Sequence, residues 1–218
     1  MGDKHHTAIT ISRQMGSGGT YIGYLLAKEL GYKYIDREIL RQASKHLKTE
    51  TDWLAQYDER SSGLLSNLLR AFSLGTPEYT GVSTVRQPIY DRDLFTLECK
   101  IMNNIVDRHD AVIIGRGGFY ALRNRPSVFR IFVHAPQEFR IKRLMKVKEL
   151  TEAKAARLEI EESDIRKTRF IRDMVGVNWT DSLNYHLCID SSMIDFSASV
   201  EMILNLVRGR RKEFSQNE

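Results

Sequence analysis

The feature that most constrains this chain is the stretch from residue 8 to residue 41, where a short apolar run, a glycine-rich turn and a helical pattern follow one another. The β-branched residues 9–11 predict a buried strand. Residues 16–19 form the turn, and apolar residues at i, i+3, i+4 and i+8 from Ile22 predict a helix. Such an order makes a phosphate cradle, because glycines let the backbone approach an anion and helix N–H groups point at it. The alternative is a turn that only joins a strand to a helix.

The turn agrees in part with the P-loop pattern G-x-x-x-x-G-K-[ST]. With Gly18 as the second glycine, Thr20 takes the last position, from which a hydroxyl reaches a magnesium ion. Arg13 then stands at the first glycine and Gly19 at the lysine. We predict that Arg13 is catalytic and supplies the cation that the lysine position lacks. The alternative is that Arg13 pairs only with a surface carboxylate and that the site is inactive.

We expect the nucleotide to be bound by residues of the turn and the start of the helix: Gly16, Ser17, Gly18, Gly19 and Thr20. We also expect Thr20 to be a metal ligand.

Length and composition suit one globular domain over residues 1–218, with 42% hydrophobic residues. No apolar run approaches the roughly 18 residues of a membrane span, and no signal-peptide pattern precedes the first strand. Cys99 and Cys188 lie in apolar stretches without metal-type spacing, so we expect buried, reduced thiols. These features favour a cytoplasmic protein without a membrane partner.

The formal net charge of +5 suits an anionic partner. No zinc finger, RNA-recognition signature or long basic run supports nucleic acid, and the basic residues 208–212 are typical of a solvated helix end. We therefore expect a small nucleotide rather than a nucleic acid as the partner.

Five apolar runs alternate with helical patterns, an order typical of a parallel sheet covered on both faces. The expected strands are residues 9–11, 32–35, 111–115, 128–135 and 186–190. Residues 44–88 read as a mostly helical insert that ends in a loop. After the fourth strand, basic residues that include Arg143 crowd a helix, a pattern that is usually a solvated face.

Four segments together resemble the cytidylate kinase-like family of P-loop kinases: ITISRQMGSGG, YIDREIL, IIGRGG and WTDSLNYHLCIDSS. The resemblance implies a three-layer P-loop NTPase fold with strand order 2-3-1-4-5, and ATP and Mg²⁺ as cofactors. It also implies that residues 44–88 are the acceptor-binding insert and that residues 140–165 are a lid over the donor phosphates, with Arg143 of the lid a catalytic residue. From periodicity alone, the insert could equally be a surface helical pair without a ligand.

The resemblance also implies an acceptor site formed by Asp36, Arg41, Arg116 and Arg166, with the two later arginines also catalytic. Arg41 is offset by one residue from the family pattern. Arg116 follows a buried strand and stands between glycines, and its structural alternative is a salt bridge to Asp36. Asp36 could instead be only a helix cap.

Two positions depart from the family pattern: Gly19 replaces the P-loop lysine, and Gly117 stands where cytidylate kinases usually carry an aspartate. The sequence therefore favours phosphoryl transfer from ATP to a nucleoside monophosphate, with CMP or dCMP as the default acceptor. The alternatives are a nucleotide-binding module of the same fold without catalysis, and a kinase for another small acceptor.

Overall fold

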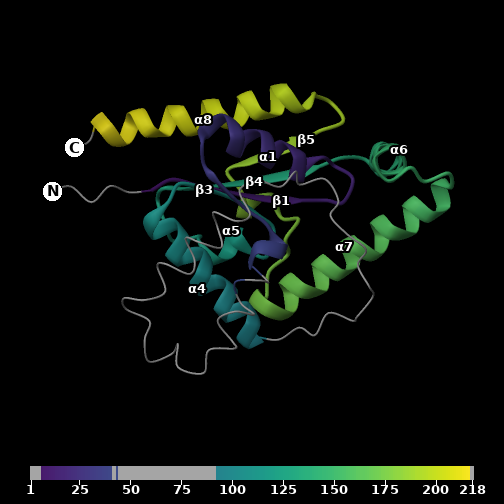
Figure 1. The fold of residues 1–218 in the computed structure, drawn as a ribbon, viewed down its shortest axis with the longest axis horizontal. Coiled ribbons are helices and arrows are strands. Elements are labelled where there is room, and N and C mark those ends of the chain that lie inside the picture. The colour runs from purple at the N-terminus through teal and green to yellow at the C-terminus, as the bar shows by residue number, and fades with distance from the viewer. Residues whose placement is uncertain (1–5, 41–42, 44–91, 217–218) are drawn as a thin grey trace.

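The computed structural model of the chain describes residues 6–40, 43 and 92–216 (Figure 1). Five strands form one parallel sheet in the order β2-β3-β1-β4-β5, as predicted. The strands are β1 (Ala8–Arg13), β2 (Lys33–Ile35), β3 (Ala111–Ile114), β4 (Val128–His134) and β5 (Leu187–Asp190). The predicted insert at residues 44–88 lies outside the described residues.

Helices cover both faces of the sheet, as Figure 1 shows: α1 and α8 lie on one side, and α4, α5 and α7 on the other. Their bounds are α1 (Gly19–Leu30), α4 (Arg92–Arg108), α5 (Gly118–Ala121), α6 (Gln137–Lys148), α7 (Ala153–Val175) and α8 (Phe196–Gln216), with a 3₁₀ turn, η1 (Ser182–Asn184). The segment expected to be a lid, residues 140–165, spans most of α6, the turn after it and the first half of α7.

β1 lies at the centre of the sheet, and its position decides where the glycine turn is presented. Ala8 is in register with Ala111 of β3 and with Val128 of β4. Both faces of β1 and β3 are buried, which explains why β3 reads as a continuous apolar run and why β1 is rich in β-branched residues. The turn after β1 therefore lies at the middle of the carboxyl edge, where open α/β sheets bind ligands.

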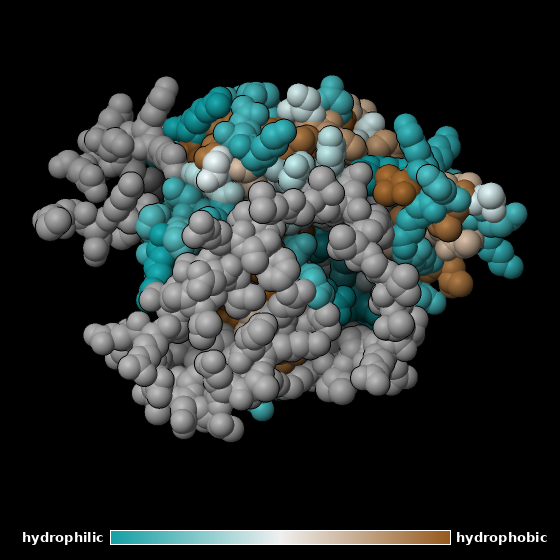
Figure 2. Space-filling view, in the orientation of Figure 1, coloured by the Kyte–Doolittle hydropathy of each residue, from teal (hydrophilic) through white to brown (hydrophobic). Residues whose placement is uncertain are grey.

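Two separate apolar cores hold the layers together. One joins the sheet to α1 and α8 through residues such as Ile11, Leu26 and Leu204, all of them fully buried. The other joins the opposite face to α4 and to the helical turn at residues 37–40. In Figure 2, hydrophilic side chains gather on the outer surfaces of α6 and α8, as expected for helices that bury one face. No described helix is long and apolar enough to cross a membrane.

The prediction for the cysteines is wrong at one position. Cys99 is half-buried in α4, but Cys188 is exposed. β5 is an edge strand whose Ile189 faces the core with α1 and α8, so its neighbour Cys188 points to the other face, where the described helices leave it open.

A third apolar cluster fixes the segment that returns from α7 to β5. Phe132 of β4 packs edge-on against Trp179 and stacks on Tyr185, with ring centroids 5.5 and 5.2 Å apart. The buried hydroxyl of Tyr185 donates a 2.6 Å hydrogen bond to the Trp179 carbonyl. This bond closes the loop that carries Trp179 beneath α7.

We expect Tyr185→Phe to lower the free energy of unfolding by about 1–2 kcal/mol, because the buried Trp179 carbonyl loses its donor. Chemical denaturation of both proteins measures the change. Tyr21→Phe is the matched control, since the structure describes no hydrogen bond of its hydroxyl, and it should change stability by less than about 0.5 kcal/mol. Equal stability of Tyr185→Phe and the wild type would show that this hydroxyl does not hold the loop.

Candidate active site

The turn between β1 and α1 presents backbone N–H groups at the carboxyl edge of the sheet. Gly16 and Gly18 have φ angles of +80° and +82°, in the left-handed region that favours glycine. Gly18 caps α1 without a side-chain hydrogen bond, so the N–H groups of the first turn of α1 have no intrahelical acceptor. Of the residues predicted to hold the nucleotide, Gly16, Gly18 and Gly19 thus lie together at one helix N-terminus, an arrangement that suits an anion.

Ser17 anchors this turn to the sheet rather than pointing into the site. Its buried hydroxyl donates to the carbonyls of Gln14 and Val133, at 2.9 and 3.2 Å. The hydroxyl of Ser191, after β5, donates a 2.6 Å bond to the Ser17 carbonyl. If Ser17 contributes to nucleotide binding, it does so through its backbone.

Arg13, the last residue of β1, extends from the turn toward the end of β3. Its Nε donates to Thr20 Oγ1 at 3.2 Å. A Cβ atom on Gly115, the residue after β3, would lie only 2.2 Å from Arg13 Nη1. A Cβ atom on Gly19 would lie 2.6 Å from the Cβ of Arg13 and 3.0 Å from that of Val133. Arg13 and Val133 therefore occupy the space that a side chain at residue 19 would need, and the guanidinium of Arg13 occupies that at residue 115.

Lys167 of α7 approaches Arg13 from the other side of the edge. Burial, together with the nearby charges of Arg13 and Arg140, lowers the pKa of Lys167 to about 7, while Asp164 acts to raise it. Its Nζ lies 3.6 Å from Asp164 Oδ1 and 5.7 Å from the centroid of the Trp179 ring. Arg140 of α6 pairs with the other Asp164 oxygen at 2.6 Å and donates to the Met15 carbonyl at 3.3 Å. We call Arg13, Arg140 and Lys167 the cation cluster.

Within the cation cluster, Arg13 was predicted from the sequence as a catalytic residue, whereas the place of Lys167 beside it was not predicted. Arg166, which was predicted to bind the acceptor, is half exposed and pairs with Glu162 at 3.1 Å along α7. One residue further along the helix, Lys167 faces the carboxyl edge instead. A signal was present in the sequence, because Asp164 and Lys167 are three residues apart and so share a helix face.

Arg116 is held at the end of β3 by a partner other than the one expected. Its Nε donates to Glu98 Oε2 at 2.9 Å, and its Nη2 bonds to the same oxygen. Glu98 belongs to α4 and is 1% exposed. The expected structural alternative, a salt bridge to Asp36, is therefore wrong, because α4 passes beneath the end of β3 and brings Glu98 closer. Burial raises the pKa of Glu98, while Arg116 and Arg37 act to lower it.

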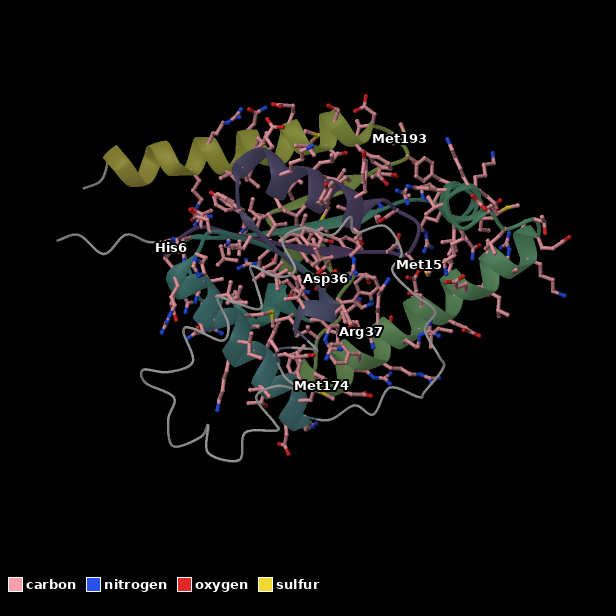
Figure 3. All side chains as sticks on the ribbon, in the orientation of Figure 1. His6, Met15, Asp36, Arg37, Met174 and Met193 are labelled. Carbon is pink, nitrogen blue, oxygen red and sulfur yellow. The ribbon has the colours of Figure 1, made fainter. Side chains whose placement is uncertain are left out.

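Asp36 acts as the helix cap that the sequence left open as an alternative. Its Oδ1 accepts hydrogen bonds from the N–H groups of Glu38 and Ile39, at 2.9 and 3.1 Å. In Figure 3, Asp36 and Arg37 follow β2 and lie between the sheet and α7. Arg41, another predicted acceptor residue, lies outside the described residues.

Arg143 lies on the donor side of the turn. Its guanidinium carbon is 5.0 Å from the centroid of the Phe196 ring, and a Cβ atom on Gly18 would meet both side chains. The cation predicted for the lid segment thus packs over the start of α8, beside the N-terminus of α1.

A magnesium site made of protein carboxylates is absent from the described part of the chain, which has no group of three or more His, Cys, Asp or Glu residues placed to hold a metal. Thr20 lies at the start of α1, and its hydroxyl accepts the hydrogen bond from Arg13. Magnesium usually keeps several waters and binds through phosphate oxygens. Thr20 is therefore the described residue that fits as a protein ligand of an ion that arrives with a nucleotide.

Solved structures share this fold at low sequence identity. An uncharacterized protein from Eubacterium ventriosum ATCC 27560 has 18% identity and a TM-score of 0.67, over 93% of this chain and 99% of that chain. TT1252 from Thermus thermophilus has 16% identity and a TM-score of 0.50, over 94% and 99%. Shikimate kinase from Bacteroides thetaiotaomicron has 14% identity and a TM-score of 0.48, over 93% and 98%. No curated protein matches the chain.

The family model of the cytidylate kinase-like family matches residues 8–193, which include the turn, Arg116 and the cation cluster. The strand order and the glycine turn are those of a P-loop kinase fold. The chain belongs to the cytidylate kinase-like family.

Proposed function

We propose that the protein transfers the γ-phosphoryl group of ATP to a small acceptor that itself carries a phosphate, with CMP and dCMP as the first candidates. The observation that carries this proposal is the path of Arg13, from the turn that presents helix N–H groups to the end of β3, where Arg116 begins the acceptor side. A cation between a donor site and an acceptor site is what phosphoryl transfer requires, since charge develops on the transferring group.

The residues divide the work by position. The N–H groups of Gly19, Thr20 and Tyr21 bind donor phosphates at the start of α1. Arg13 lies beside them and cannot lose its proton, so it stabilises charge on the group in transfer. ATP, when bound, supplies the phosphoryl group, and the accompanying Mg²⁺ shields part of the phosphate charge.

Two further cations of the site, Lys167 and Arg116, would offset the negative charge of the bound phosphates. Lys167 is brought by α7 to the same edge, and a phosphate there would favour its protonated form. Arg116 presents a planar guanidinium suited to the oxygens of an acceptor phosphate. Asp36 and Arg41, at the end of β2 and just beyond it, remain proposed neighbours of the acceptor.

The second candidate is a nucleotide-binding module without catalysis. Glycine at the lysine position and glycine at residue 117 favour it. We expect instead measurable turnover of ATP with at least one member of a panel of nucleoside monophosphates, with CMP or dCMP preferred. Coupled assay of ADP release measures it. Tight ATP binding without turnover on any member would support the binding module, and turnover only with another small acceptor would support the third alternative.

Arg13→Ala should lower kcat by about 10³-fold, the lower end of the effect of an arginine at a transferring phosphoryl group. ATP affinity should change far less, because the backbone N–H groups still bind the phosphates. Arg208→Ala, which removes an exposed arginine of α8 paired with Glu201 at 4.0 Å, is the control and should retain wild-type kcat. Full activity in Arg13→Ala would refute a catalytic role.

Gly19→Lys should inactivate the wild type, because its Cβ would overlap that of Arg13. Arg13→Ala keeps the Cβ atom and therefore does not relieve that overlap, so the double variant should be inactive as well. Steady-state assay of the three variants gives the comparison. A gain of activity in Gly19→Lys alone would mean that the chain had lost its cation rather than moved it.

Nucleotide binding should take up protons above pH 7. The free Lys167 ammonium has a pKa of about 7, so at pH 8 it is mostly neutral, and a bound phosphate raises that pKa. We expect uptake of up to about one proton per site at pH 8. Titration calorimetry with a non-hydrolysable ATP analogue, in buffers of different ionisation enthalpy, measures the uptake. Lys167→Arg stays charged and should abolish it, whereas equal uptake in both proteins would contradict the assignment.

A further inference from the structure

Glu98 is a buried carboxylate among apolar side chains. Apolar packing alone does not explain why a charged residue occupies this position. It lies in α4, an amphipathic helix whose other buried residues, such as Leu97 and Ile101, are apolar. Its side chain is 1% exposed, yet burial disfavours its charged form and raises its pKa. The described structure gives it one hydrogen-bonded partner, Arg116.

Arg116 has an unfavourable backbone conformation. Gly115, Arg116 and Gly117 follow one another with φ angles of +71°, +52° and +70°. Only the middle residue carries a side chain, and left-handed backbone is costly for such a residue. Strained residues of this kind persist where surrounding contacts hold them, and they gather at functional sites.

The contacts fix the guanidinium of Arg116 from two sides. Glu98 accepts from Nε and Nη2, which form one edge of the guanidinium plane. The ring of Phe170, from α7, covers one face, with the guanidinium carbon 4.6 Å from the ring centroid. The other edge, which includes Nη1, is not used by Glu98, and that is the edge that can bind two phosphate oxygens at once.

The side chains of Arg116 and Glu98 differ in their exposure to solvent. Arg116 is 15% exposed and Glu98 is 1% exposed. A ligand at the edge of the sheet therefore meets the cation and not its counter-ion. Arg37, which follows β2, also acts to lower the pKa of Glu98, so it lies close enough to interact with that carboxylate.

We propose that Glu98 is a positioning residue for the acceptor, which acts through Arg116 by aiming its free edge at the acceptor phosphate; this inference rests on the proposed function. Glu98 reaches Arg116 from α4, beneath the site. It touches no reacting atom.

The proposal predicts an acid limb in acceptor binding. The charged carboxylate holds Arg116, so protonation of Glu98 as the pH falls releases the guanidinium. Because burial raises its pKa, this loss begins at a higher pH than for an ordinary glutamate. Among the described residues, the charged or titratable groups that act on Glu98 are Arg116 after β3, Arg37 after β2 and Cys99 in α4, and none of them changes charge in mildly acidic solution.

Glu98→Gln tests the proposal, because it keeps the shape of the side chain and removes its charge. We expect the acceptor KM to rise about tenfold while the KM for ATP stays within about twofold, since Arg116 is not on the donor side. The acid limb of the acceptor kcat/KM should disappear in this variant. Asp107→Asn is the matched control, because it weakens the exposed pair of Asp107 with Arg125 on the same helix, and it should change neither KM.

Three outcomes would overturn the inference while leaving the function intact: unchanged acceptor KM in Glu98→Gln, an equal rise in both KM values, or an acid limb that persists. Should the wild type phosphorylate no acceptor, the function fails and a second readout decides. Inorganic phosphate should then shift the Arg116 Nε–H resonance of the wild type, and about tenfold more phosphate should be needed in Glu98→Gln. The same phosphate response in both proteins, or none in the wild type, would overturn the positioning role.

Discussion

The placement of one guanidinium, that of Arg13, determines the rest of the candidate site. It begins on the central strand, bonds Thr20 and reaches the residue after β3, so it spans the two halves of the edge. Gly115 has no room for a side chain because the guanidinium of this arginine lies there, and Gly19 has none because the Cβ atoms of Arg13 and Val133 lie there. The cations on α6 and α7 then complete the cluster around it.

The fold could be predicted because its signals are local. Runs such as residues 8–13 and 111–114 are buried on both faces, so the second reads as a continuous apolar strand and the first is rich in β-branched residues. The strand order came from the resemblance and not from these patterns. Cys188 shows what local sequence patterns do not predict. Its apolar neighbours suggested burial, but burial also depends on whether the strand lies at an edge of the sheet and on what covers each face. Both depend on how distant segments of the chain pack together.

The site was predictable in part for the same reason. The glycine turn and Arg116 stand at strand ends, where topology alone assigns them to one edge. Lys167 and Glu98 stand on helices, where a shift of one residue turns a side chain by about 100°. Arg166 and Lys167 are adjacent in the sequence, yet only Lys167 faces Trp179 and the cation cluster. Which helical charge enters the site depends on the approach of α4 and α7 to the sheet, which no spacing in the sequence reveals.

The most direct test of the account is a crystal structure of the protein with ADP, Mg²⁺, an aluminium fluoride that imitates the transferring group, and the acceptor found by assay. The measured quantity is the distance from the Arg13 guanidinium nitrogens to the fluoride ligands. The account predicts a hydrogen-bond distance of about 2.7–3.2 Å, with residue 19 contributing only its backbone N–H. An Arg13 that still bonds only Thr20 while another cation contacts the fluoride would contradict it.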